Sequence, residues 1–294
     1  MNIIKTNTLN DKELSAVKEL EALCKERDGL SGSLFLSPEL NYDESLPCFL
    51  LLYEADTLSA FLSIFMPSED EAQISVCTHP DRRRQGFCMK LLSEAADILE
   101  EYDIYDMVFL TEPGGVAFET LLEKLNGEMI SSEYFMTYDS SGSGISPVNT
   151  DELYELAPAY LKNLDTLTDI HHRAFDTDYD ESEAFVHELL CDESVNAYVL
   201  LDKTTGKIIG GCYLDTSSSQ LIILGVCIDP DIQGKGLGRL MMAELITKYA
   251  LPYNKPISLQ VSGSNLAAKH LYEKLGFTVT SQFDYHVVDC ANIF

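Results

Sequence analysis

Hydrophobic and polar residues alternate along the chain with two different periods. Short apolar runs rich in β-branched residues, of which 221–228 is the clearest, have the length and composition of buried strands. Longer stretches place apolar residues three and four positions apart. The helix expected over 237–250 has such a face, formed by Leu237, Leu240, Met241, Leu245 and Tyr249. Strands and helices interleave throughout, so the pattern predicts an α/β fold with a mixed sheet.

The predicted elements occur in the same order twice. Each half begins with a strand, continues with one or two helices and three strands, and ends with a helix, a strand, a helix and a strand. The first series ends with a strand over 128–138, and the second begins with a strand over 153–159. Between them, Ser-Ser-Gly-Ser-Gly at 140–144 has the composition of a flexible linker. We therefore expect two copies of one domain, over 1–139 and 149–294, joined by a linker over 140–148.

The chain of 294 residues is strongly acidic, with 48 Asp and Glu, 20 Lys and Arg, and a formal net charge of −28. This excess of acid opposes binding to nucleic acid and to anionic membranes, so we expect neither as a partner. The eight cysteines form no CxxC pair, which favours reduced thiols and no metal. The opening residues lack the pattern of a signal peptide, and no apolar run has the length of a membrane span. These features predict a cytoplasmic protein.

A glycine-rich loop separates the strand over 221–228 from the helix that follows it. Its sequence is Gln233-Gly234-Lys235-Gly236-Leu237-Gly238, and Arg239 comes next. Glycines let an anion approach the backbone closely, and the N–H groups at the start of a helix favour negative charge. The loop therefore predicts a phosphate or pyrophosphate site, although glycines at a tight turn also serve geometry alone. It matches neither the P-loop spacing nor the dinucleotide-binding fingerprint.

The first half has a related segment at the corresponding position. THPDRRRQGFCMKLL over 78–92 stands beside IDPDIQGKGLGRLMM over 228–242. The first copy is more basic, and Cys88 occupies the position of Gly238. The repeating unit is a whole half of the chain. Such a unit is too long for a solenoid repeat, so it indicates two related domains.

Both halves resemble the GNAT superfamily of N-acetyltransferases. That family binds pyrophosphate through the pattern [Q/R]-x-x-G-x-[G/A], which 233–238 matches in full and 83–88 matches except at Cys88. A second family signature, with Asn, Ala and Tyr ahead of Leu-Gly-Phe, corresponds to NLAAKHLYEKLGF over 265–277. The resemblance covers nearly the whole chain. It implies two tandem acyl-CoA N-acyltransferase domains, each with a central, mostly antiparallel sheet flanked by helices.

The resemblance implies acetyl-CoA as co-substrate of the second half, and no metal. The loop would contact the pyrophosphate, and the strand edge at 226–228 would bind the pantetheine arm. An N–H near Cys227 would stabilise charge on the acetyl oxygen, an effect worth about 3–4 kcal/mol. Asn265 would contact the cofactor or cap its helix. The implied cofactor-binding residues are Val226, Cys227, Ile228, Gln233, Gly234, Lys235, Gly236, Leu237, Gly238, Arg239 and Asn265.

Tyr272 is the expected catalytic residue, because it holds the tyrosine position of the second signature. A phenol, with a reference pKa of about 10, can donate a proton to the CoA thiolate that leaves. The alternative is a core tyrosine between Leu271 and Leu275 on an amphipathic helix. The general base stays open among Asp215, His171, His172, Glu273 and His286. His171 and His172 do not suggest a metal, since adjacent helix positions do not converge on one point.

The first half lacks the corresponding chemistry, with Leu122 at the tyrosine position and Gly115 at the asparagine position. We therefore expect it to be non-catalytic. The leading function is transfer of an acetyl group to a primary amine of a small molecule, and the acidic surface slightly favours a cationic one. The alternatives are acetylation of a protein N-terminus or lysine, or an acyl-CoA-binding sensor without turnover. The chain is expected to act as a monomer or a homodimer.

Overall fold

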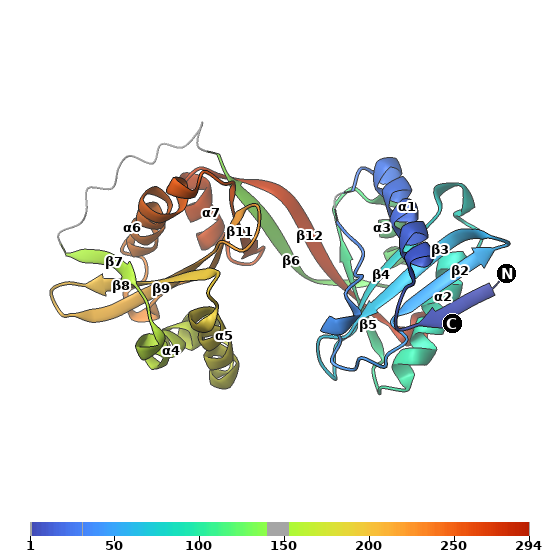
Figure 1. Cartoon of the computed structure of the whole chain (residues 1–294), viewed down its shortest axis with the longest axis horizontal. Coiled ribbons are helices and arrows are strands. Elements are labelled where there is room, and N and C mark those ends of the chain that lie inside the picture. Colours follow the sequence, from blue (N-terminus) through green and yellow to red (C-terminus); the bar gives the residue numbers. More distant parts are fainter. Residues whose placement is uncertain (1, 31, 140–152, 294) are drawn as a thin grey trace. The chain divides into compact units, whose positions relative to one another are not determined.

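The computed structural model describes residues 2–30, 32–139 and 153–293 (Figure 1). The chain divides into two compact units. Unit 1 comprises Met1–Glu133 and Ser281–Phe294, and unit 2 comprises Tyr134–Thr280. The linker predicted over 140–148 lies outside the described residues.

Unit 1 contains the elements expected of the first half. Its helices are α1 (Asp11–Asp28), α2 (Phe87–Glu100) and α3 (Val116–Lys124), with 3₁₀ turns at Pro38–Leu40 and Pro80–Arg82. Its strands are β1 (Asn2–Thr6), β2 (Phe49–Glu54), β3 (Thr57–Phe65), β4 (Gln73–Thr78) and β5 (Asp106–Thr111), followed by β6 (Glu128–Tyr138), which continues into unit 2. Helix α1 begins at a capping box, because Asn10 accepts from the backbone of Glu13 while the Glu13 carboxylate accepts from the Asn10 N–H.

Unit 2 repeats the order. Its strands are β7 (Tyr154–Pro158), β8 (Val195–Asp202), β9 (Lys207–Asp215), β10 (Leu221–Ile228), β11 (Ile257–Ser262) and the start of β12 (Phe277–Asp289). Its helices are α4 (Leu164–Phe175), α5 (Tyr179–Cys191), α6 (Leu237–Glu244) and α7 (Leu266–Lys274). A π-helical turn at Leu245–Ala250 continues α6, so the helix expected over 237–250 is present but changes its hydrogen-bond pattern partway. Short 3₁₀ turns lie at Leu161–Asn163, Pro230–Ile232 and Leu251–Tyr253 in unit 2, whereas the 3₁₀ turn at Cys290–Asn292 follows β12 in unit 1.

The sheet confirms the predicted mixed, mostly antiparallel fold. Its strand order is β1-β2-β3-β4-β5-β12 on the side of unit 1, and β6-β11-β10-β9-β8-β7 on the side of unit 2. Among the pairings described residue by residue, β4 with β5 and β10 with β11 are parallel, and the others are antiparallel. The helices pack on this sheet, with α2 against β2, β3 and β4 in unit 1 and α4 against β9 and β10 in unit 2.

The last strand of each half contributes to the other unit. The end of β12 pairs antiparallel with β5, from Asp284 opposite Thr111 to Asp289 opposite Asp106. Val288 on this strand is fully buried in the core of unit 1. In the same way, β6 delivers Met136 to the core of unit 2, where it is also fully buried. Because the last strands are exchanged, the boundaries of the compact units differ from a division of the chain at the linker. The repeat in the sequence does not reveal which part of the sheet each last strand joins.

Both units have substantial cores, as 46% apolar residues allow. The core of unit 1 surrounds β2 and β3, where Phe49 and Phe61 pack against each other. None of the described helices combines the length and the apolar character that crossing a membrane requires.

Candidate functional site

Strand β10 separates from its parallel neighbour halfway along its length. Its pairing with β11 covers Leu221 to Ile223 and ends at Ile223 opposite Leu259. On its other side, the register with β9 shifts between Leu224 and Cys227. Gly225 lies within this bulge at φ +54°. A Cβ atom at that position would lie 2.8 Å from the Tyr213 ring, so glycine is required both by the backbone angle and by the space.

The separation of the strands exposes one backbone edge of β10. Among the described pairings, residues 224–228 face no partner on β11. Cys227 and Ile228 instead lie opposite Gly211 and Gly210 on β9. The edge near Val226 is therefore open to an extended ligand that adds to the sheet as a strand would.

The glycine loop follows this open edge directly. After a 3₁₀ turn at Pro230–Ile232, Gly234 and Gly236 adopt φ +77° and +80°, and α6 begins at Leu237. A Cβ at either glycine would meet no atom within 4 Å, so it is the backbone conformation that requires glycine. No backbone acceptor within the described chain pairs with the N–H groups of Leu237, Gly238 and Arg239. These groups are available to an anion.

The side chains around the loop complete a fit to a pyrophosphate. Lys235 and Arg239 are exposed, and neither forms an ion pair with a described residue. Gly238 lies where α6 approaches α7, since a Cβ there would be 3.4 Å from the Leu271 side chain. Free N–H groups, open space at the glycines and two unpaired cations fit a diphosphate group.

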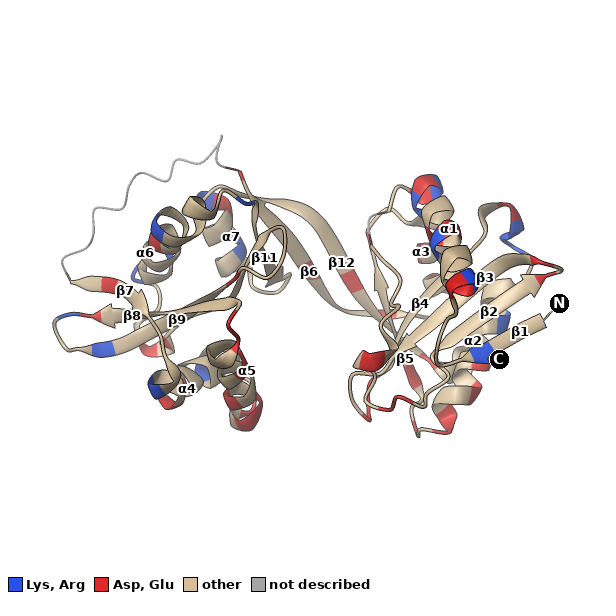
Figure 2. Ribbon diagram, in the orientation of Figure 1, with Lys and Arg blue, Asp and Glu red and all other residues tan. Residues whose placement is uncertain are grey.

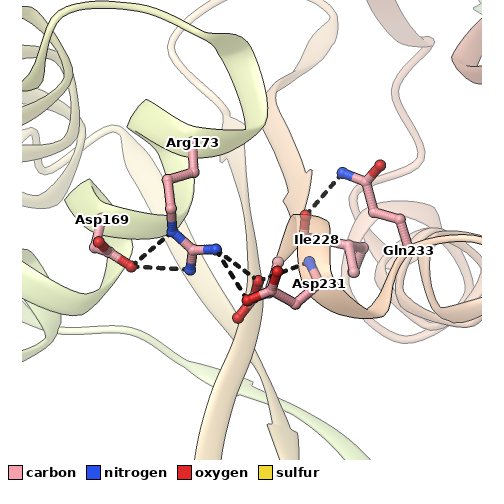
Figure 3. Close-up of polar contacts among 6 residues, drawn as sticks. Asp169, Arg173, Ile228, Asp231 and Gln233 are labelled. Carbon is pink, nitrogen blue, oxygen red and sulfur yellow. Dashed lines mark hydrogen bonds and ion pairs between the residues drawn. The ribbon is translucent and has the colours of Figure 1, made fainter.

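Two polar contacts hold the turn ahead of the loop (Figure 3). Gln233 Nε2 donates to the carbonyl oxygen of Ile228 at 3.0 Å, which ties the loop to the end of β10. Arg173 on α4 donates to Asp229 at 2.9 Å and to Asp169 at 2.9 Å, and lies 3.6 Å from Asp231. The hydrogen bond from Arg173 holds the pKa of Asp229 below its usual value. Gln233 thus has a structural role that accounts for its place in the motif.

Tyr272 projects from α7 into the core of unit 2 and is 6% exposed. Its ring meets Phe277 edge to face, with centroids 6.0 Å apart. Burial raises the pKa of Tyr272 to about 12, with smaller contributions from Cys212 on β9 and Cys227 on β10. No described residue hydrogen-bonds to its hydroxyl. The side chain is thus a neutral phenol whose hydroxyl is not engaged by a described residue.

Asn265 caps α7, accepting from the N–H of Ala268 at 3.0 Å. This contact explains an asparagine at that position without a ligand. Because Gly115 offers no such cap at the start of α3, the two halves differ here in local structure as well as in sequence.

The candidate bases are not brought together. His286 lies in unit 1, where its Nδ1 is 3.4 Å from Thr111 Oγ1. Asp215 pairs opposite Ile222 at the end of β9 away from the bulge, and its carboxylate accepts from the N–H of Ser217. Glu273 is exposed on α7, and His172 Nδ1 contacts the carbonyl oxygen of Thr177. His171 is 8% exposed and faces α5.

Unit 1 has the same plan in altered form. Strand β4 pairs with β5 through Gln73 and Ile74, but its register with β3 continues to Thr78 without a bulge. Arg84 and Gly86 take positive φ angles of 61° and 81°, as Gly234 and Gly236 do. Leu122, at the position of Tyr272, is buried without a polar group. Unit 1 thus has the loop but neither the bulge nor the phenol.

The residue that corresponds to Gln233 is Arg83, and it makes the same backbone contact. Arg83 Nε donates to the carbonyl oxygen of Thr78 at 3.3 Å. Its guanidinium also binds Asp28 on α1 in a bidentate pair at 2.6 and 2.7 Å. Each unit therefore ties its first helix to the turn by an ion pair, with the charges placed in opposite order.

Comparison with known families agrees with this geometry. Residues 14–124 and 164–277 each match the profile described as "Acetyltransferase (GNAT) family". The chain belongs to the GNAT family. The two matched segments cover most of both halves, so the predicted tandem arrangement of GNAT domains is confirmed.

Curated GNAT relatives match short segments of the chain. The mycothiol acetyltransferase of Gordonia bronchialis is 43% identical over 63 residues, which are 21% of this chain and 20% of that protein. The [ribosomal protein bS18]-alanine N-acetyltransferase of Salmonella typhimurium is 40% identical over 58 residues, 20% of this chain and 39% of that protein. The chain thus covers well under half of the length of either relative.

Solved structures match the whole chain at low identity. A GCN5-related N-acetyltransferase from Sphaerobacter thermophilus superposes with a TM-score of 0.77 and 15% identity, covering 98% of this chain and 96% of that one. A tandem GNAT protein from the clavulanic acid biosynthesis pathway gives a TM-score of 0.65 and 15% identity, covering 98% of both chains. At this identity the likeness concerns the fold.

Sequence reasoning missed the side chains that surround the bulge. Phe185 on α5 approaches Gly225, with its Cε1 atom 3.3 Å from where a Cβ would be. Tyr213 and Phe185 meet edge to face with centroids 6.4 Å apart. The signal for Tyr213 was its position on the strand paired with β10. No local pattern distinguishes Phe185 from an ordinary core residue.

Proposed function

We propose that unit 2 binds acetyl-CoA along the open edge of β10 and transfers its acetyl group to a primary amine. The observation that carries the proposal is the order of three features. Pairing of β10 with β11 ends at Ile223, the bulge follows at Gly225, and the loop with free N–H groups begins at Gly234. The pantetheine arm would lie along 226–228, and the pyrophosphate would reach Gly234, Gly236 and the N–H groups of 237–239, beside Lys235 and Arg239.

Two groups of this chain would act on the thioester. Backbone N–H near Cys227 would stabilise negative charge on the carbonyl oxygen, which is worth about 3–4 kcal/mol for one well-placed donor. Tyr272 would donate its proton to the departing thiolate, and its raised pKa keeps the phenol protonated across the physiological range. The sulfur would then leave as a neutral thiol.

We propose a cationic small-molecule amine as the acceptor. Helix α5, whose Phe185 approaches the bulge, carries four acidic residues and no Lys or Arg (Figure 2). The chain as a whole has a net charge of −28, which raises the local concentration of cations. Acetylation of a protein N-terminus is the second candidate, because a curated relative of that type matches the chain.

The test is thiol release from acetyl-CoA by the full chain in the presence of three acceptors: spermidine, an aminoglycoside, and a short peptide with a free N-terminus. Release that depends on an amine, with the acetylated product identified by mass spectrometry, is the expected result. Tight binding of acetyl-CoA without release in the presence of any acceptor would overturn the proposal in favour of a sensor. The full chain is needed because β6 supplies Met136 to the core of unit 2.

A further inference from the structure

Helices α4 and α5 pack against each other around a buried polar cluster formed by Thr168, His171 and Ser182. Thr168 and His171 are three residues apart, so they share one face of α4. Both are buried, and Thr168 is fully so. Thr168 Oγ1 finds no hydrogen-bond partner in the part of the chain that the structure describes. An unpartnered buried hydroxyl costs about 1–3 kcal/mol, so apolar packing does not explain a threonine at this position.

Contacts on several sides hold the His171 ring within this cluster. Its Nδ1 lies 3.0 Å from Ser182 Oγ on α5, and Ser182 Oγ lies 2.8 Å from Thr177 Oγ1. The ring lies against Phe175 and Phe185, with centroid distances of 4.4 and 4.8 Å. When Nδ1–H donates to Ser182, and Ser182 donates to Thr177, Nε2 is left as an acceptor without a described partner.

The cluster is connected to the bulge of β10 through the ring of Phe185. Phe185, which packs on His171, is also the residue whose Cε1 atom lies 3.3 Å from a Cβ placed on Gly225. Gly225 lies where the proposed function requires the acyl group. Described contacts therefore link His171 to Gly225 through Phe185.

We propose that His171 accepts the proton that the acceptor amine loses as it is acetylated. This assignment rests on the proposed function and supplies the base which that function leaves open. The amine nitrogen forms a bond to the acyl carbon, and the bond from that carbon to sulfur breaks. The proton on nitrogen moves to Nε2 of His171, and Tyr272 gives its proton to sulfur. The products are an amide and a free thiol, and exchange with water restores both side chains.

The surroundings of His171 favour its neutral form. Burial lowers its pKa, so the imidazole is uncharged near neutral pH and able to accept a proton. The titratable and charged groups on the elements around it are Asp165, Asp169, His172 and Arg173 on α4, Tyr179, Asp180, Glu181, Glu183, His187, Glu188 and Cys191 on α5, Lys207, Cys212, Tyr213 and Asp215 on β9, and Cys227 on β10. None of them is a resolved cause of the shift, which comes from burial.

The decisive variant is His171→Gln in the full chain, assayed as thiol release with spermidine, the aminoglycoside and the peptide. General-base catalysis contributes about 10²–10⁴-fold, so kcat should fall by at least about 100-fold near neutral pH. The acidic limb of the kcat/KM profile, which lies below the usual titration range of histidine, should disappear. The dissociation constant for acetyl-CoA should not change. His187→Gln on the exposed face of α5 is the matched control and should behave as wild type.

Ser182→Ala gives a second measurement if the first variant fails to fold. It removes the acceptor of the Nδ1 proton, which destabilises the protonated ring, so the acidic limb should move to lower pH.

The outcomes separate the inference from the function on which it rests. Wild-type activity with an unchanged pH profile in folded His171→Gln, or in Ser182→Ala if His171→Gln does not fold, would overturn the role of His171 and leave the acetyltransferase proposal intact. Absence of thiol release by wild type with every acceptor would overturn both.

Discussion

Burial keeps the Tyr272 phenol protonated, as its proposed role as proton donor to the leaving thiolate requires. Its pKa of about 12 ensures that the phenol is neutral, and a free hydroxyl is available for the thiolate. Tyr272→Phe should therefore lower kcat by about 10²–10³-fold while the dissociation constant for acetyl-CoA stays the same. A thiol-release assay measures kcat, and titration calorimetry measures the dissociation constant for acetyl-CoA.

Tyr198→Phe is the control for that substitution. Tyr198 is 7% exposed and burial also raises its pKa to about 12, but it lies on β8 and packs on Tyr249. An equal loss of kcat in both variants would show that the Tyr272 effect is general to buried tyrosines.

Glycine at 236 is required by the backbone angle, not by the space around it. Gly236→Ala places an L-residue at φ +80°, which costs about 1–2 kcal/mol and turns the N–H groups away from the anion. Binding of acetyl-CoA should weaken by about tenfold or more, since about 1.4 kcal/mol corresponds to tenfold. Gly206 is a matched control, with φ +72°, no atom within 4 Å of a Cβ, and a place in the turn between β8 and β9. Gly206→Ala should lose similar stability and keep full affinity.

At the scale of elements, the ion pair between α4 and the turn after β10 should depend on pH. Arg173 lowers the pKa of Asp229, so the pair stabilises the fold above the unfolded-state pKa of Asp and loses this effect as pH falls through the folded-state value. Arg173→Met should reduce the free energy of unfolding by up to about 1 kcal/mol near neutral pH, because the guanidinium is partly exposed.

The difference between Arg173→Met and wild type should shrink as pH falls below the usual pKa of Asp and disappear below the lowered folded-state pKa of Asp229, as measured by denaturant unfolding at several pH values. Lys203→Met, at an exposed lysine in the turn between β8 and β9, controls for the loss of one positive charge. A difference that persists unchanged in acid would show that Arg173 acts through packing.

The end of β12 should stabilise unit 1, although it directly follows unit 2 in the sequence. Val288 pairs opposite Met107 on β5 and is fully buried. Val288→Ala removes two buried methyl groups and should lower the free energy of unfolding of unit 1 by about 2 kcal/mol. Hydrogen exchange should show faster opening of β5, while β9 and β10 keep their protection. Val261→Ala on β11 is the reciprocal control and should affect unit 2.

The order and type of the elements could be predicted from the sequence because periodicity reflects which faces are buried. The predicted strand at 221–228 and the helix beginning at 237 coincide with β10 and α6. The pairing partner of β12 could not be predicted, since a strand that begins after the Leu-Gly-Phe signature reads the same whether it joins β5 or a strand of its own half. The glycine motif predicted the loop, whereas the bulge depends on a contact between Gly225 and Tyr213 across two strands.

At the scale of the whole molecule, we expect unit 2 to bind acetyl-CoA and unit 1 not to bind it. In unit 1, β4 pairs with β3 without a register shift, and the guanidinium of the loop residue Arg83 forms an ion pair with Asp28. Calorimetry should therefore give one acetyl-CoA bound per chain. Gly86→Ala, which disturbs the loop of unit 1 at φ +81°, should leave both stoichiometry and turnover unchanged. A stoichiometry of two, reduced to one by Gly86→Ala, would contradict this division.

The exchange of last strands has a consequence for synthesis of the chain. The ribosome makes residues 1–133 before any of β7 to β11, yet β5 acquires its partner at Asp284–Asp289 only after all of those strands have been translated. Until then, one edge of the nascent sheet presents unpaired backbone groups, which can capture a strand from another chain. The half that is made first is thus the half that is finished last, and it is during translation that this protein is most exposed to pairing with a wrong partner.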